Sequence, residues 1–301
     1  MLDTAYLMSI SEKIVIVSNE NASKSRIIKP VFNWLDNYTL SEGESLDDNR
    51  ISRLLSEGYS VVIFPEGKRN PDSSILRFHK GAFYLAEKNK VDILPLFIHG
   101  VNHIFPRNSL CTYPGEVTIS IGSRIKPDDT SWGDNYAMRT KTIHKFYVSE
   151  YDKLRKGKET AEYFRKFVSD RYRYKGIEVS SAVAKRIRKY DAYSQWVDGY
   201  ESQHSEKDVI IMNSGYGEFA LMLALCHPEK NVFAIESDED KYLVAKHSSE
   251  QIAKNLIHLH ASDTNYMTSN MHLNEAVIYL VEPSAEEEKI YQKYNPIIIK
   301  K

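Results

Sequence analysis

The sequence predicts an α/β protein built from two domains. In residues 1–134 and again in 206–301, short Val- and Ile-rich runs alternate with amphipathic stretches, which is the pattern of strands alternating with helices. A length of 301 residues suits two domains, and a hydrophobic share of 42% is enough for packed cores. Residues 135–205 are expected to form a basic helical region that either links the two sheets or supplies the N-terminal helices of the second domain.

The first domain is predicted element by element from its apolar runs and turn residues. Asp47 and Asp48 can cap a helix that runs to Glu57, and Gly58 ends it. The expected helices are 3–11, 25–35, 48–57 and 80–89. The expected strands are 13–17, 59–64, 93–98 and 116–121, the last alternating polar and apolar residues as an edge strand does.

The first domain is organised around one short corner, Phe64–Asn70, which reads Phe-Pro-Glu-Gly-Lys-Arg-Asn. It directly follows the predicted strand at 59–64. Pro65 cannot donate to a sheet ladder, so the strand ends there. Gly67 permits a backbone conformation or a close approach that other residues resist.

This corner carries one carboxylate, Glu66, and two cations, Lys68 and Arg69. Open α/β sheets place their ligands at the carboxyl ends of strands, where these side chains would lie. The planar fork of arginine beside the point charge of lysine suits a phosphate group. The alternative is an ordinary turn with solvated charges.

Two further blocks follow the corner: Phe78-His-Lys-Gly81 and the proline-containing strand Ile93-Leu-Pro-Leu96. Together with the corner they resemble the glycerolipid acyltransferase family, which carries F-P-E-G-x-R-S, then F-x-x-G, then a proline-containing strand. Asn70 stands where that family has serine. The family moves fatty acyl groups from a thioester to lysophosphatidic acid or glycerol 3-phosphate, and the resemblance implies that Glu66, Gly67, Lys68 and Arg69 bind the acceptor phosphate.

The resemblance also implies a general base, the histidine of an H-x-x-x-x-D motif that takes the acceptor hydroxyl's proton. Leu2-Asp3-Thr-Ala-Tyr-Leu matches the end of that motif, so Asp3 takes the role of orienting the base. The histidine would precede Met1, and His79 is better explained as a surface or packing residue than as a substitute. We therefore expect a chain that begins inside a longer polypeptide and is nearly inactive alone. A degenerate acyltransferase is the second possibility.

The sequence motifs indicate the identity of the acceptor less clearly than they indicate the phosphate-binding corner. Around residues 34–42 the family has a block with an arginine for the substrate phosphate, whereas here Arg26 and Arg50 are the nearest. The expected partners are a lysophospholipid acceptor and, as acyl donor, acyl-CoA or an acyl carrier protein. No cofactor and no metal are expected for acyl transfer.

Composition narrows the possible partners and compartment. The net charge of −1 argues against a nucleic-acid binder, although residues 139–189 hold 16 Lys/Arg against 6 Asp/Glu. That basic stretch is either a solvated helix face or a surface for anionic lipid or an acidic acyl donor. Cys111 and Cys226 suit a reducing compartment. With no apolar run long enough to span a bilayer and no signal peptide, we expect a cytoplasmic protein, peripheral to the inner membrane or tethered by an upstream part.

One helical face is expected to run through the end of the basic stretch, formed by Val183, Ile187, Tyr190, Ser194 and Val197. The following domain is predicted to contain helices at 218–226 and 239–253. Its expected strands are 208–212, 231–235, 256–259, 276–281 and 296–299. Between the first strand and the first helix lies a glycine turn, Asn213-Ser-Gly-Tyr-Gly-Glu-Phe219.

An acid at the end of the second strand strengthens this turn as a ligand site. Glu236 follows Gly217 by 19 residues and can accept ribose hydroxyls, while Gly215 and Gly217 let a ligand approach the backbone. The region resembles Rossmann-like class I S-adenosylmethionine-dependent methyltransferases, which implies that Asp263 lies beside the adenine. Two departures are Ile211 in place of the first acid and Asn213 in place of the first glycine. In addition, Val281-Glu-Pro-Ser284 forms no clear catalytic motif.

The order of the two domains also resembles the tail of bacterial fusion polypeptides that begin with an MMPL-type membrane exporter. Two other functions stay open. The chain is either an S-adenosylmethionine-dependent methyltransferase with a vestigial acyltransferase half, or a non-catalytic module that binds lipid or nucleotide.

Overall fold

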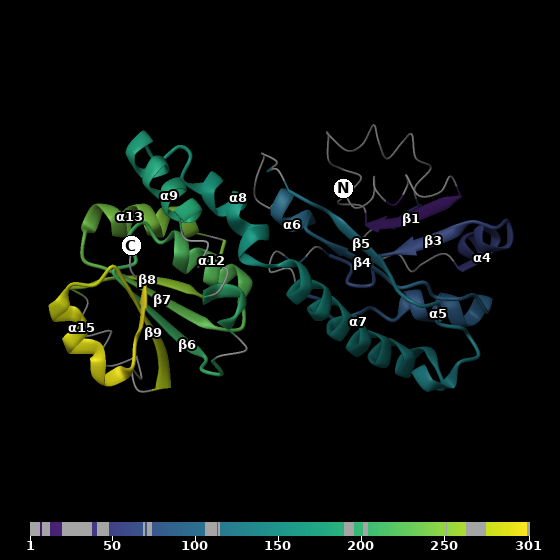
Figure 1. The fold of residues 1–301 in the computed structure, drawn as a ribbon. Coiled ribbons are helices and arrows are strands. Elements are labelled where there is room, and N and C mark those ends of the chain that lie inside the picture. Colours follow the sequence, from purple (N-terminus) through teal and green to yellow (C-terminus); the bar gives the residue numbers. More distant parts are fainter. Residues whose placement is uncertain are drawn as a thin grey trace. The chain divides into compact units, whose positions relative to one another are not determined.

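A computed structural model gives the fold (Figure 1) and divides the chain into two compact units, Met1–Arg155 and Lys156–Lys301. The residues it describes are 7, 13–19, 38–40, 48–68, 70, 74–105, 113, 115–189, 196–200, 204–250, 252–262 and 275–299. The predicted helix at 25–35 and, apart from Leu7, the predicted helix at 3–11 lie outside them. The mixed α/β architecture is confirmed in both units.

A three-stranded parallel sheet forms the centre of the first unit's N-terminal half. Its strands are β1 (Ile14–Asn19), β2 (Tyr38–Leu40) and β3 (Ser60–Ile63), in the order β2-β1-β3. The helices α4 (Asp48–Ser56) and α5 (Gly81–Asn89) pack on it. Val15, Val17, Ile51 and Leu85 make the buried cluster between them. The carboxyl end of β3 therefore leads straight into the corner at 64–70.

A second, antiparallel pair of strands completes the first unit. β4 (Leu96–His99) pairs with β5 (Thr118–Ile121), and α6 (Val101–Ile104) follows β4. A 3-10 turn, η1 (Thr130–Trp132), then precedes the long helix α7 (Tyr136–Lys158). The predicted strand at 93–98 starts later than expected because Ile93 makes only an isolated bridge with Ile125, and Pro95, which cannot donate, precedes β4.

The second unit contains a five-stranded parallel sheet. Its strands are β6 (Asp208–Met212), β7 (Asn231–Glu236), β8 (Leu256–His260), β9 (Ala276–Val281) and β10 (Ile297–Ile299). Their order is β10-β9-β6-β7-β8. Counted within this unit, the order is 3-2-1-4-5, that of a doubly wound sheet, in which strand order reverses between the first and fourth strands. Sheets of this kind bind ligands beyond the carboxyl ends of the two strands at the reversal, which here are β6 and β9.

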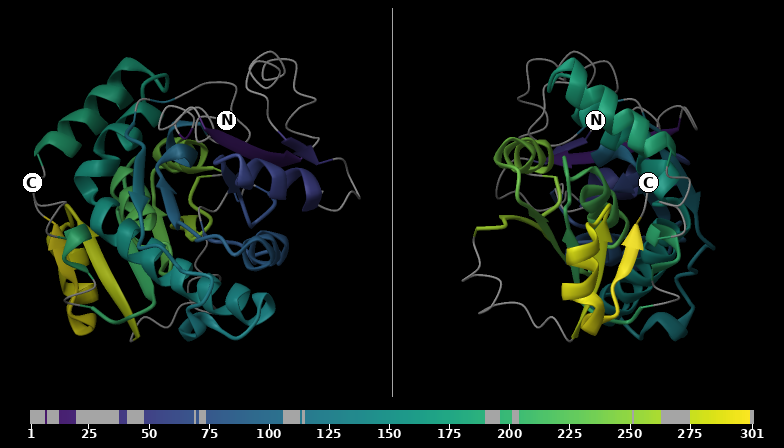
Figure 2. Two further views of the ribbon diagram at one scale, coloured as in Figure 1. Left: turned by 90° about the vertical axis from the view of Figure 1, so that its right-hand side faces the viewer. Right: turned by 60° about the vertical axis from the view of Figure 1, so that its left-hand side comes forward.

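Helices cover both faces of this sheet, and its strands β6, β7 and β9 are largely apolar, as strands buried on both faces are. On one face, Val209 and Ile211 join a core shared with α8 (Ala161–Arg171), α9 (Ile177–Lys189) and α12 (Glu218–Cys226). Helix α13 (Glu239–Ser249) packs beside β7 and β8. On the other face, Ile210 lies in a cluster against which Tyr291 and Tyr294 pack, from α15 (Ala285–Tyr291) and η3 (Gln292–Tyr294), shown yellow in Figure 2.

The helical region predicted to link the domains is split between the two units. Most of α7 belongs to the first unit, whereas α8 and α9 belong to the second. Val183 and Ile187 are buried as expected, but Tyr190 and Ser194 lie outside the described residues. Within the described part of the chain, no helix is both long and apolar enough to cross a membrane.

Candidate functional site

The corner after β3 is a hydrogen-bonded turn. The Gly67 amide donates to the Phe64 carbonyl at 3.0 Å, which places Pro65 second and the glycine fourth in the turn. These are the positions that type I turns favour for the two residues. Gly67 has φ +67°, in the left-handed region that glycine adopts without steric cost. The glycine of the motif is thus required by the backbone itself.

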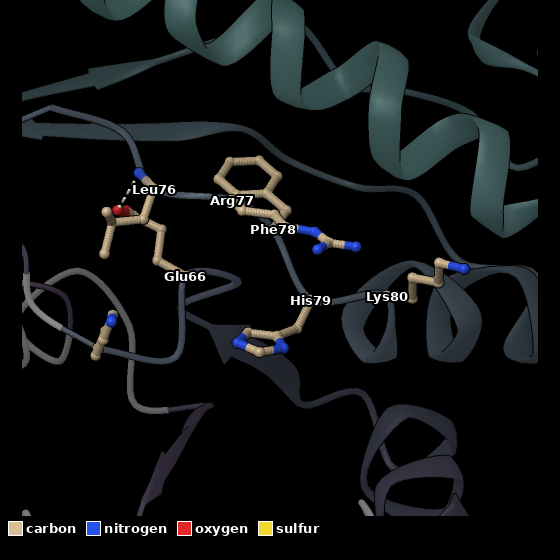
Figure 3. A pocket seen from close by; sticks show the side chains of 7 residues that line it. Glu66, Leu76, Arg77, Phe78, His79 and Lys80 are labelled. Atoms are coloured by element: carbon tan, nitrogen blue, oxygen red, sulfur yellow. Dashed lines mark hydrogen bonds between the residues drawn. The ribbon is translucent and has the colours of Figure 1, made fainter.

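A returning segment, Leu76–Lys80, is bonded onto this turn (Figure 3). The His79 amide donates to the Pro65 carbonyl at 2.7 Å, and the Leu76 amide donates to the Glu66 carboxylate at 2.8 Å. The His79 ring lies so close over Gly67 that an added Cβ would be 3.1 Å from its Cδ2 and Nε2. The corner and the returning segment therefore form one rigid unit.

The Glu66 carboxylate is half-buried, and its environment opposes its ionisation. Burial raises the pKa of Glu66, while the Leu76 amide and the nearby His144 act in the opposite direction. His144 Nε2 itself lies 3.1 Å from the Leu76 carbonyl. The carboxylate therefore serves in part to hold the returning segment in place.

An aromatic cluster supports the returning segment from behind. The ring of Phe78 is buried and meets His144 and Tyr147 of α7 edge-on, at centroid distances of 4.9 and 5.1 Å. Burying Phe78 fixes its neighbours, Arg77 and His79, as exposed side chains because adjacent residues of an extended segment point to opposite sides. Gly81 starts α5, so the F-x-x-G block joins the segment to the helix.

A cavity of about 620 Å³ opens beside the corner, within the size range of ligand pockets. It is lined by Glu66, Lys68, Leu76, Arg77, Phe78, His79 and Lys80. Three of these side chains, Lys68, Arg77 and Lys80, are exposed cations, and none makes an ion pair within the described residues. Such a cavity can accept an anion and is suited to a phosphate.

Of the predicted site residues, Glu66 and Lys68 line the cavity and Gly67 forms the turn between them. Arg69 and Asp3 lie outside the described residues, so their roles stay predictions. Sequence reasoning missed Arg77 and Lys80 as cavity residues. Their signal was present in the F-x-x-G block, since a buried Phe78 in an extended segment directs Arg77 toward the opposite side.

The glycine turn of the second unit lies at the reversal of strand order. Gly215 and Gly217 have φ +61° and +78°, and Asn213 has φ +54°. Asparagine tolerates this left-handed conformation better than most residues, so replacing the first glycine preserves the turn. The other departure, Ile211, is fully buried in the sheet core. Asp263 lies outside the described residues.

The acid predicted for ribose binding is already engaged within the protein. Glu236 accepts hydrogen bonds from the amides of Gly215 at 2.6 Å and of Ser237 and Asp238 at 3.0 Å each. Above the turn, the Arg186 guanidinium lies where a Gly215 side chain would be, and its Nη1 is 3.3 Å from the buried Glu218 carboxylate. In this arrangement the turn is covered by a side chain of the same unit.

Comparison with known families supports the first unit's resemblance. Residues 1–99 match the acyltransferase family, a range that includes the corner, the F-x-x-G block and β4. The N-terminal part of the chain is therefore similar in sequence to acyltransferases.

Individual relatives match part of the chain. A 1-acyl-sn-glycerol-3-phosphate acyltransferase of Cocos nucifera is 28% identical over 147 residues, 45% of this chain and 46% of that protein. The human beta enzyme of the same name is 31% identical over 100 residues, 31% of this chain and 36% of that protein. The chain thus spans less than half of the length of these relatives.

Among solved structures, the 1-acyl-sn-glycerophosphate acyltransferase PlsC of Thermotoga maritima is similar at a TM-score of 0.41 and 22% identity. The match covers 50% of this chain and 62% of PlsC.

Proposed function

We propose that this chain takes part in transferring a fatty acyl group from a thioester to a lysophosphatidate-type acceptor. One observation carries the proposal: the region that matches the acyltransferase family folds its Phe-Pro-Glu-Gly corner beside a cavity lined by three cations that make no ion pair with any described residue. The relatives named above carry this activity in their names. Acyl-CoA or an acyl carrier protein would supply the acyl group.

In this reaction the acceptor hydroxyl attacks the thioester carbonyl, loses its proton to a base, and the thiol leaves. The contribution of the described residues is to bind and position. Lys68, Arg77 and Lys80 would hold the phosphate of the acceptor, with Arg69 as a proposed fourth cation. Fixing the phosphate in this way fixes the distance from it to the reacting hydroxyl. Asp3 and the histidine that it would orient belong to the proposal.

Calorimetric titration of the whole chain with glycerol 3-phosphate tests the cavity without requiring turnover. We expect binding to glycerol 3-phosphate but not to glycerol, and a loss of about tenfold for Arg77→Gln or Lys80→Gln, since each removes a charge-assisted bond. Arg124→Gln is the matched control, because Arg124 is an exposed cation of the same unit that pairs with Asp92 at 3.7 Å. Equal loss in the control, or equal binding of glycerol, would refute the phosphate role.

A second candidate function, S-adenosylmethionine binding with or without methyl transfer, rests on the doubly wound strand order and on the glycine turn at its reversal. Glu236 already accepts hydrogen bonds from three backbone amides, which favours a structural role for this carboxylate over ribose binding. Calorimetry with S-adenosylmethionine separates the alternatives. A heat of binding that the Gly215→Val variant lacks would support S-adenosylmethionine binding at this turn. If no heat of binding is measured, the glycine turn has only a structural role.

The setting of the proposed reaction follows from its substrates. Lysophospholipids reside in membranes, so we propose that the chain works at an anionic membrane surface, in the cytoplasm and peripheral to the inner membrane or tethered to it. The resemblance to bacterial fusion polypeptides that begin with a membrane exporter is part of the same proposal, since an exporter would tether the chain to the membrane. A non-catalytic module that binds lipid or nucleotide would bind the ligands above without supporting acyl transfer.

A further inference from the structure

The turn between α8 and α9 presents two large apolar side chains to solvent. We name residues 173–178, Arg-Tyr-Lys-Gly-Ile-Glu, the hairpin tip; all six are exposed. Tyr174 is 89% exposed and Ile177 is 88% exposed, while the next most exposed large apolar side chain among the described residues, Ile121, reaches 58%. Single exposed apolar residues are ordinary. Two large apolar side chains that are almost fully exposed on one turn are not ordinary, and they suggest a binding surface.

The hairpin that carries this tip is firmly anchored. Helices α8 and α9 lie side by side in the second unit (Figure 1). Val168, Tyr172 and Val183 are fully buried in the main core. The Tyr172 hydroxyl donates to the Tyr216 carbonyl at 2.7 Å. Because the residue just before the tip is locked in this way, Tyr174 and Ile177 are held outward by a packed base.

Cations surround the apolar side chains. Arg173 and Lys175 flank Tyr174, and Lys185 lies two turns along the exposed side of α9. None of the three makes an ion pair within the described part of the chain. Gly176, with φ +103° and open space around its α-carbon, lets the chain turn sharply between the two apolar residues. The tip therefore combines an aromatic and an aliphatic group with two exposed cations, Arg173 and Lys175, and one exposed acid, Glu178.

We propose that the hairpin tip docks on an anionic lipid bilayer. Tyr174 and Ile177 would enter the boundary between headgroups and acyl chains, where tyrosine is favoured, and Arg173 and Lys175 would meet lipid phosphates. A bilayer fits better than a protein partner, because a specific protein interface takes about 20–30 residues from each side and the hairpin tip has six. The inference rests on the membrane setting proposed above and names the element of the second unit that would meet the bilayer.

Sedimentation of the whole chain with vesicles tests this directly. We expect it to bind vesicles of 30 mol% phosphatidylserine in phosphatidylcholine far more tightly than pure phosphatidylcholine, and to weaken as salt is raised. Tyr174→Ser with Ile177→Ser should reduce the partition coefficient at least tenfold, on the order of two buried apolar groups. Arg173→Gln with Lys175→Gln should reduce it about thirtyfold, since each charge contributes a factor of about five.

Leu243→Ser with Ile290→Ser is the matched control, since these side chains are 40% and 55% exposed elsewhere in the same unit. Circular dichroism melts of all variants exclude unfolding. Vesicle binding that the tip variants leave unchanged, or the absence of binding by the unmodified chain, would overturn the proposal. Glycerol 3-phosphate binding is measured without vesicles, so failure of the proposed function would be seen separately.

Discussion

Gly67 shows how much a single residue decides in the candidate site. Its left-handed backbone ends the turn, and its missing side chain lets the His79 ring close over it. Glu66 contributes in a similar way, through the bond from the Leu76 amide that fixes the returning segment. The site therefore depends first on two residues that shape the backbone, and only then on the cations that line the cavity.

Gly67→Ala tests this dependence. The substitution should cost about 1–2 kcal/mol of unfolding free energy, because alanine is strained at φ +67° and its Cβ meets His79. It should also weaken glycerol 3-phosphate binding. Urea denaturation measures the first effect. Gly157→Ala is the control, since it lies within α7 with open space around it and should gain about 0.5–1 kcal/mol. Equal stability of the two variants would contradict the role assigned to Gly67.

His258 makes the second unit sensitive to acid. Burial, with a smaller effect of Lys246, lowers the pKa of His258 from 6.5 to about 4, and its Nε2 is 2.7 Å from the Ser249 hydroxyl. Between pH 6.5 and about pH 4, His258 binds a proton more readily in the unfolded chain than in the folded one. The stabilisation is therefore complete above about pH 6.5 and declines as pH falls toward 4, by up to about 3 kcal/mol.

Hydrogen exchange of the β7 and β8 amides at pH 7, 6 and 5, corrected for intrinsic rates, measures this decline. The variant His258→Gln should show a flatter profile over the same range. An unmodified chain whose protection is independent of pH between 7 and 5 would be inconsistent with a neutral, buried His258.

At the scale of elements, the regular strands and helices were the most predictable. β6, α12 and β9 have the predicted bounds, because each is a compact apolar run between clear turn residues. Helix α13 ends at Ser249, short of the predicted 253, although the residues after it continue the helical composition. The contact of Arg186 with the glycine turn could not be predicted, since it joins residues far apart in the sequence and depends on how α9 packs.

The link between α9 and α12 is a second prediction at this scale. Arg186→Ala should destabilise the second unit by about 3 kcal/mol, because it leaves the 1%-exposed Glu218 carboxylate without its cation. Adding Glu218→Gln should recover part of the loss by removing the buried charge, as a double-mutant cycle in urea would measure.

Lys166→Ala is the control, since its exposed pair with Asp170 should be worth less than about 0.5 kcal/mol. If Arg186→Ala cost no more than this control, the ion pair would be no more than a surface contact.

At the scale of the whole chain, the sequence indicated the α/β class and the charge asymmetry, whereas the position of the unit boundary required the structure. A net charge of −1 conceals the basic stretch at 139–189. The structure divides that stretch: α7 contributes to the core behind the corner, and the cations of the hairpin tip lie in the second unit. Amphipathic helices carry little information about which sheet they cover, which is why the sequence leaves residues 135–205 open between a linker and the N-terminal helices of the second domain.

The phosphate role of the cavity is the claim on which the rest depends. Nuclear magnetic resonance of the whole chain, titrated with glycerol 3-phosphate, locates the ligand directly. Our account predicts that the largest shifts fall on the Gly67 amide and on the side-chain nitrogens of Lys68, Arg77 and Lys80, with Arg124 unaffected. Saturable shifts confined to other parts of the chain, or none at millimolar ligand, would contradict it.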